Sequence, residues 1–169
     1  MGIVDKTSYK KSSANIPVDA IAATGADSLI IVARAAITTG DSSTSIFRIA
    51  EVPSNFVAVG GEITCEALTG LDDVDLGLYE NTENGGAVID VDALVDGADL
   101  TLALAPGAGL SPISAITIAN QDAALYTLAS DVSSERQTYT LALTLNKDCA
   151  AGGAVVVKLY LVRREYARA

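Results

Sequence analysis

The sequence predicts an all-β protein: an antiparallel β-sandwich or jelly-roll-like barrel with an extended N-terminal arm and one short helix. Three observations lead to this fold class. Short segments alternate between apolar and polar residues, clusters of Gly, Pro, Asn and Asp separate them, and no series of helices lies between them. The chain of 169 residues is long enough to bury a substantial core. We assign residues 1–27 to the arm and residues 28–169 to the sandwich domain.

Residues 1–27 predict an arm because polar and small residues dominate, apolar periodicity is poor and Pro17 interrupts the segment. Two interpretations stay open: a flexible terminus, or an arm that becomes ordered on a partner. Under the second interpretation, Tyr9, Lys10 and Lys11 are candidate partner-binding residues.

The segments expected to form strands combine β-branched or alternating apolar residues with turn residues at their ends. They are 28–37, 45–52, 56–68, 74–80, 87–91, 100–105, 113–119, 136–146 and 153–164. Within the third of these, the pair Gly60 and Gly61 predicts a bulge or bend.

The segment 136–146 has the clearest alternation. One face carries Tyr139, Leu141, Leu143 and Leu145, and the other carries Thr138, Thr140 and Thr144. Such a pattern is typical of a half-buried antiparallel strand. The segment 121–130 is the one stretch that favours a helix, with apolar residues at i, i+3 and i+4: Leu125, Leu128 and Ala129.

The charge distribution argues against nucleic acid as a partner. The net charge is −10, and no Lys or Arg lies between Ile49 and Glu135, so the middle of the chain would repel phosphate. Basic residues gather near the two ends, where Arg163 and Arg164 are further partner-binding candidates. No apolar run approaches the ~20 residues that cross a bilayer, and the first residues show no secretion signal, so no membrane is expected.

The composition also argues against catalysis. The chain has no histidine, which removes the commonest general base, metal ligand and activator of a nucleophile. It has no tryptophan either, so a platform for stacking sugars is not expected. We therefore predict that the chain is not an enzyme and binds no cofactor. Cys65 and Cys149 are interpreted as small core residues, with a disulfide as the open alternative.

The acidic stretch 71–100 contains the best candidates for binding a cation. Asp73 with Asp75, and Asp90 with Asp92, have the Asp-x-Asp spacing that supplies hard oxygen ligands to calcium. The terminal Glu of an EF-hand loop is missing. A solvated acidic face is therefore the favoured interpretation, and no metal site is assigned.

Two stretches, 47–100 and 135–163, resemble small virion proteins of tailed bacteriophages, which are capsid-associated structural proteins. The similar features are the turn IAEVPSN, the strand DVDLGLY, the loop GGAVIDVDALVDGADL and the closing hairpin TYTLALTLNKDCAAGGAVVVKLYLVR. The resemblance implies a decoration or cement protein on the outside of the phage head, made in the host cytoplasm. Its implied partners are the major capsid protein and further copies of itself, as a homo-dimer or homo-trimer.

Two alternatives to this function stay open. One is a different virion part, such as a head-fibre base or a tail protein. The other is a carbohydrate-binding β-sandwich adhesin, which would need an exposed aromatic or calcium-bound acidic site.

Overall fold

The structure is a computed structural model that describes residues 5–7, 23–25, 28–81, 86–130 and 138–164. Its strands are β1 (Asp5–Thr7), β2 (Ala23–Gly25), β3 (Ser28–Ile37), β4 (Ile46–Pro53), β5 (Phe56–Cys65), β6 (Val74–Glu80), β7 (Val88–Ala98), β8 (Thr138–Leu145) and β9 (Gly153–Arg163). Its helices are the 3₁₀ turn η2 (Ile118–Asn120) and the single turn α1 (Leu125–Leu128). No helix in these ranges is long and apolar enough to cross a bilayer.

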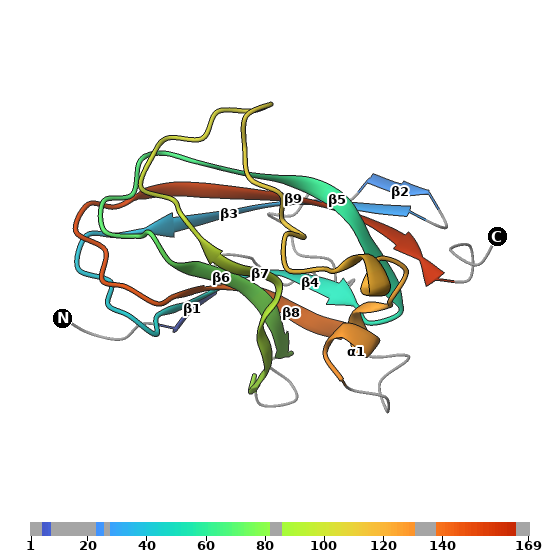
Figure 1. The fold of residues 1–169 in the computed structure, drawn as a ribbon. Helices are drawn as coiled ribbons and strands as arrows, with labels where there is room; N and C mark the ends of the chain where they lie inside the picture. The colour runs from blue at the N-terminus through green and yellow to red at the C-terminus, as the bar shows by residue number, and fades with distance from the viewer. Residues whose placement is uncertain (1–4, 8–22, 26–27, 82–85, 131–137, 165–169) are drawn as a thin grey trace.

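The strands form two sheets that face each other (Figure 1). One sheet has five strands in the order β1-β4-β8-β6-β7, and the other has four in the order β2-β3-β9-β5. All neighbours are antiparallel except β1 and β4, which are parallel. The predicted antiparallel sandwich is confirmed, and its strands do not close into the barrel that was the alternative form.

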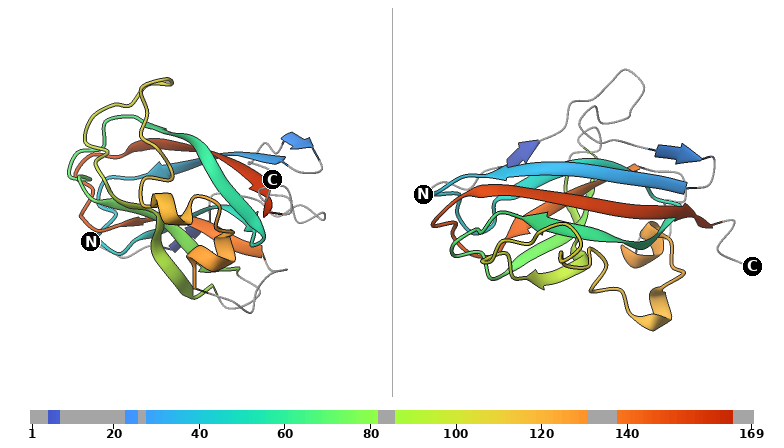
Figure 2. Two further views of the ribbon diagram at one scale, coloured as in Figure 1. Left: turned by 45° about the vertical axis from the view of Figure 1, so that its right-hand side comes forward. Right: turned by 90° about the horizontal axis from the view of Figure 1, so that it is seen from above.

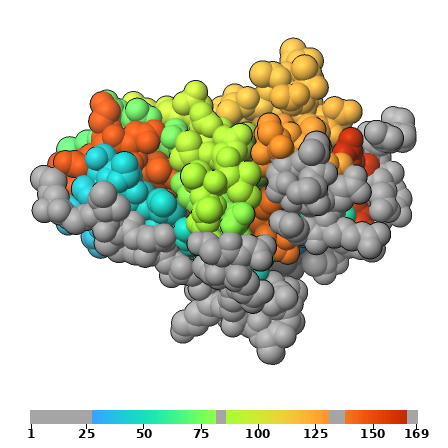
Figure 3. Space-filling view, turned by 90° about the horizontal axis from the view of Figure 1, so that it is seen from below, coloured from blue at the N-terminus to red at the C-terminus, as the bar shows by residue number. Residues whose placement is uncertain are grey.

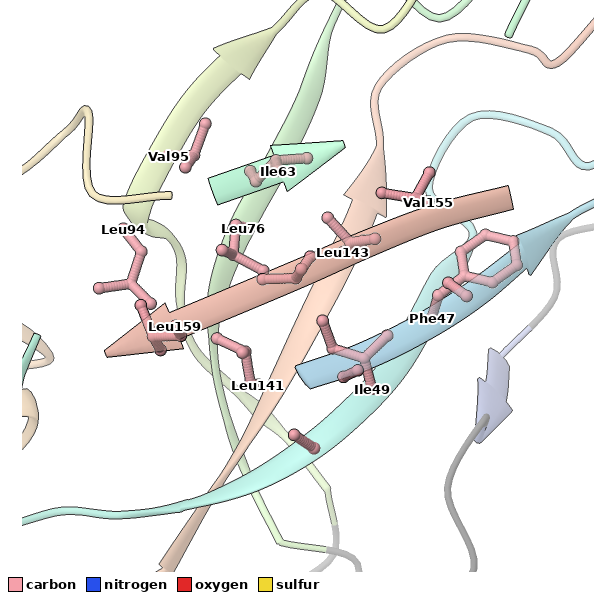
Figure 4. Close-up of a cluster of buried hydrophobic side chains, with 14 of the residues drawn as sticks. Phe47, Ile49, Ile63, Leu76, Leu94, Val95, Leu141, Leu143, Val155 and Leu159 are labelled. Atoms are coloured by element: carbon pink, nitrogen blue, oxygen red, sulfur yellow. The ribbon is translucent and has the colours of Figure 1, made fainter. Parts of the chain in front are cut away.

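Alternation along each strand places one apolar face of each sheet in the interior. The side chains that meet between the sheets are at most 2% exposed (Figure 4), and they include Phe47, Ile49, Leu76, Leu141, Leu143, Ile63, Val155 and Leu159. Burying each such side chain stabilises the fold by about 1.5–3 kcal/mol. The core therefore lies where the sequence pattern predicts it.

Several elements confirm the sequence predictions closely. β3 and β6 begin and end at the predicted residues, 28–37 and 74–80. The register between β5 and β9 shifts between Ala58 and Gly60, which confirms a bulge at the glycine pair. The predicted short helix is α1, which buries Leu125 against the core.

Two predicted strands, 100–105 and 113–119, are wrong. The structure has a long loop there, which contacts strands through isolated bridges between Cys65 and Leu104 and between Ile63 and Leu110. The physical reason is that a strand needs a continuous ladder. The loop touches β5 at separate points only, and Pro106 and Pro112, which lie between the two segments, lack the amide N–H groups that could join these contacts into a ladder.

The prediction that β8 is half-buried is also wrong, because both of its faces are buried. Thr140 is 0% and Thr144 is 7% exposed. On this outer face, the Tyr79 hydroxyl lies 2.7 Å from Thr144 Oγ1, and the Arg48 guanidinium lies 5.2 Å from the Tyr79 ring centroid. Arg48 also donates to the carbonyl of Gly86 at 2.8 Å. A polar layer thus covers the centre of the five-stranded sheet.

β7 extends well beyond the predicted segment 87–91 and is strongly irregular. Leu76 pairs with Val95, but Leu78, two residues on, pairs with Asp90. Between these two pairs β7 has more residues than β6, and the extra residues bulge over Gly77. Because Gly77 has no side chain, the carbonyl oxygens of Asp90 and Val91 have room there. Glycine is required at this position by the close approach of the two strands.

The assigned arm contributes one short strand to each sheet. β1 pairs with β4, and β2 pairs with β3. The rest of residues 1–27 lies outside the described residues, so the arm boundary at residue 27 stays a prediction.

Candidate functional site

The first candidate acidic pair sits where β6 begins and β8 ends. The Asn146 side-chain amide donates to Asp73 Oδ1 at 3.0 Å and to Asp75 Oδ2 at 2.7 Å. The backbone N–H of Gly97 donates to Asp75 Oδ1 at 2.9 Å. These bonds join β6, β7 and the end of β8, so this pair has a structural role in tying three strands together.

The second candidate pair, Asp90 and Asp92, lies on the bulged part of β7. The atoms of β7, light green in Figure 3, occupy the middle of the face shown there. Burial raises the pKa of Asp90, and a hydrogen bond with Asp92 and the charge of that neighbour raise it further. The ionised form of Asp90 is therefore less favourable here than that of a solvated aspartate.

The structure keeps the two pairs apart as separate hydrogen-bonded units. Within the described ranges, no three Asp, Glu, Cys or His side chains are grouped as metal ligands would be. The assignment of the four aspartates as weak cation candidates stays a prediction that calcium titration can test.

The candidate basic residues fall into two groups. Tyr9, Lys10 and Lys11 lie outside the described residues. Arg163 ends β9, and Arg164 follows it, donating from its guanidinium to the Tyr126 hydroxyl of α1 and from its backbone N–H to the Asn55 carbonyl at 3.2 Å. Arg164 therefore binds its own chain, and contacts of either arginine with a partner stay a prediction.

The two cysteines are free thiols. Cys149 is buried, and Cys65 is partly buried with its Sγ 3.5 Å from the Leu102 carbonyl oxygen. Burial raises the pKa of both thiols. The interpretation as small core residues agrees with this arrangement, and the disulfide alternative is not formed.

A surface that the sequence analysis did not single out is the outer face of the four-stranded sheet. No other described element lies across β3 and β9 on this side (right view of Figure 2). Ile30 on β3 pairs with Tyr160 on β9, which pairs with Gly60 on β5, and the first two are 37% and 42% exposed. The signal was present in the sequence, because apolar residues also occupy the positions that alternate with the core.

The long loop after β7 is fastened to this sheet by Glu62. One carboxylate oxygen accepts the backbone N–H groups of Gly107 and of Gly109, the latter at 3.3 Å. The other lies 3.4 Å from Lys158 Nζ. The main cause that lowers the pKa of Glu62 is the hydrogen bond from the backbone N–H of Gly107. The carboxylate is therefore ionised at neutral pH, and it holds the loop against the sheet.

Comparisons of this chain with known proteins find solved structures with a similar fold. No family model and no curated protein matches the chain. A chain in the capsid of Ralstonia phage GP4 aligns with 96% of this chain and 98% of its own length, at a TM-score of 0.53 and 14% identity. This protein shares its fold with that capsid chain. A chain of the cyanophage Pam1 capsid asymmetric unit aligns over 90% and 96%, at a TM-score of 0.45 and 14% identity.

The likeness to the Ralstonia phage chain covers nearly the whole of both chains, so the two sandwiches correspond as complete units. At 14% identity it establishes the fold and leaves the function to be argued from other observations.

Proposed function

We propose that this chain is a structural protein of a tailed-phage virion that decorates the outside of the head and stabilises it by bridging capsid subunits. The observation that carries the proposal is the fold, shared end to end with a chain of a phage capsid. The resemblance of sequence motifs in β4, β6, β7, β8 and β9 to those of capsid-associated virion proteins points to the same function. In this proposal the chain is not an enzyme.

The architecture suits a role in which association matters and turnover does not. A continuous core between the two sheets holds the strands together, and the outer face of the four-stranded sheet remains for contacts with neighbours. The proposed partners are the major capsid protein and further copies of this chain, with Arg163, Arg164 and the arm residues Tyr9, Lys10 and Lys11 near shell carboxylates.

The test removes the gene from the phage that encodes it and compares purified particles with and without added protein. A decoration protein is expected to bind such particles from outside, at a copy number comparable with the major capsid protein, and to raise the temperature at which they release DNA. Protein that does not bind, or is sealed inside the head, contradicts the proposal.

The same particles separate the alternatives. A head-fibre base or tail protein would be present in a small number of copies and would be located by electron microscopy at a vertex or on the tail. A carbohydrate-binding adhesin would bind glycans on an array, and calcium would raise its melting temperature if Asp73, Asp75, Asp90 or Asp92 held the ion.

A further inference from the structure

The outer face of the four-stranded sheet is apolar along most of its length. The register of β3 with β9 places Ile30, Val32, Arg34, Val156, Lys158 and Tyr160 among its outward residues, and we call these six the β3–β9 face. Beside them, Gly60 has no side chain opposite Tyr160, and Val59 is 52% exposed at the β5 bulge. The tyrosine ring is therefore accessible next to other apolar groups, an arrangement that interfaces favour.

The charge of this face is opposite to that of the chain. Arg34 is exposed and makes no ion pair with any described residue, whereas Lys158 is paired with Glu62. The β3–β9 face therefore has one basic side chain, Arg34, that has no acidic partner among the described residues, on a chain whose net charge is −10. A complementary partner surface would be apolar with carboxylates at its border.

The size of the face is sufficient for a specific contact. β3 and β9 have 10 and 11 residues. At ~3.3 Å per residue and ~4.8 Å between strands, the surface of β3, β9 and β5 measures roughly 35 Å by 14 Å, or about 500 Å². Small specific interfaces bury about 600 Å² on each partner, so this face with its border residues reaches that range.

We propose that the β3–β9 face is the surface that docks on the capsid shell, against an apolar protein surface bordered by carboxylates. The inference rests on the proposed function and adds which side of the molecule faces the shell. A second copy docked by the same face around a two-fold axis is disfavoured, because it would place the Arg34 side chains of both copies in an interface where the β3–β9 face supplies no carboxylate. The acidic β7 then lies on the other sheet, away from the shell.

The test measures binding of purified variants to particles that lack the protein, by co-sedimentation. The double variant Ile30→Glu/Tyr160→Glu is expected to bind about tenfold more weakly or worse, since it places carboxylates on the two exposed apolar positions of the face. The matched control is Val88→Glu, which changes an apolar side chain of 58% exposure on β7 and is expected to bind like the wild type. Circular dichroism and melting temperature verify that each variant is folded.

A second pair of variants tests the charge. Arg34→Glu is expected to weaken binding, and the loss is expected to shrink as salt rises. Its control is Lys147→Glu, an exposed lysine whose partner is Asp72 at 3.6 Å.

The outcomes separate the two proposals. If the wild type fails to bind particles, the proposed function fails. If the wild type binds and the face variants bind equally well, or the controls lose as much, the docking face is wrong while the decoration role stands. Loss of self-association in solution with particle binding retained would assign the face to a second copy and would also overturn the inference.

Discussion

Replacing Gly77 with alanine tests the most demanding contact in the fold. A Cβ added at Gly77 would lie 2.2 Å from the carbonyl oxygens of both Asp90 and Val91, whereas ordinary contact begins at 3.4 Å. β7 would have to move by about 1.2 Å (3.4 − 2.2), and both opposing atoms belong to its backbone. Overpacking in a core typically costs about 1–3 kcal/mol, so we expect about 3 kcal/mol here.

For a chain of this length, that loss corresponds to a melting temperature about 6–12 °C lower. The assay is thermal unfolding followed by circular dichroism. Gly107→Ala is the control, because a Cβ there would meet nothing within 4 Å and only the positive φ of 85° opposes it. We expect the control to lose about 1 kcal/mol. If Gly77→Ala melts within about 2 °C of the wild type, the close approach of β7 does not constrain the fold.

Three further predictions concern single ionisable groups. The lowered pKa of Glu62 means that its contribution is present above the usual carboxyl pKa and lost as pH falls through the lowered value. The amide resonance of Gly107 should therefore shift on acidification, and a Glu62→Gln variant that retains this shift would contradict the assignment. The raised pKa of Asp90, caused first by burial, means that its ionised form is less favourable in the folded chain than in the unfolded chain, so its contribution to stability falls as pH rises. Asp90→Asn should raise the melting temperature at pH 7 but not at about pH 3, where the carboxyl is largely protonated in both states, and an equal gain at both would show that the ionisation of Asp90 is not the cause. Cys149 is 2% exposed and its pKa is raised by burial, so native protein should react with a thiol reagent far more slowly than protein in urea; equal rates would show that the thiol is accessible.

The strands could be predicted wherever local pattern and tertiary pairing agree. β3 and β6 have turn residues at both ends, and both occupy positions where neighbouring strands complete a ladder. The segment 100–105 has the same alternation, yet it forms no strand, because pairing depends on a neighbour that the pattern does not reveal. Leu104, which lies in this loop, packs its side chain against the core instead.

The surfaces were harder to predict than the core. The threonines of β8 are polar, and polarity normally indicates a solvated face, but Tyr79 and Arg48 come from other strands to cover them. Ile30 and Tyr160 became a candidate surface only through the pairing of β3 with β9. Strand order, and hence which side chains share a face, is a non-local property that one sequence does not specify.

The strand order also has a consequence for how the chain is made. β8 lies between β4 and β6, and β9 lies between β3 and β5, although these two strands follow all the other described strands in the sequence. Until they emerge from the ribosome, four inner strand edges have no partner, and neither layer can close. The sandwich can therefore fold only after β8 and β9 have been synthesised, and a chain terminated before Thr138 should be degraded or aggregate instead of forming a partial sandwich.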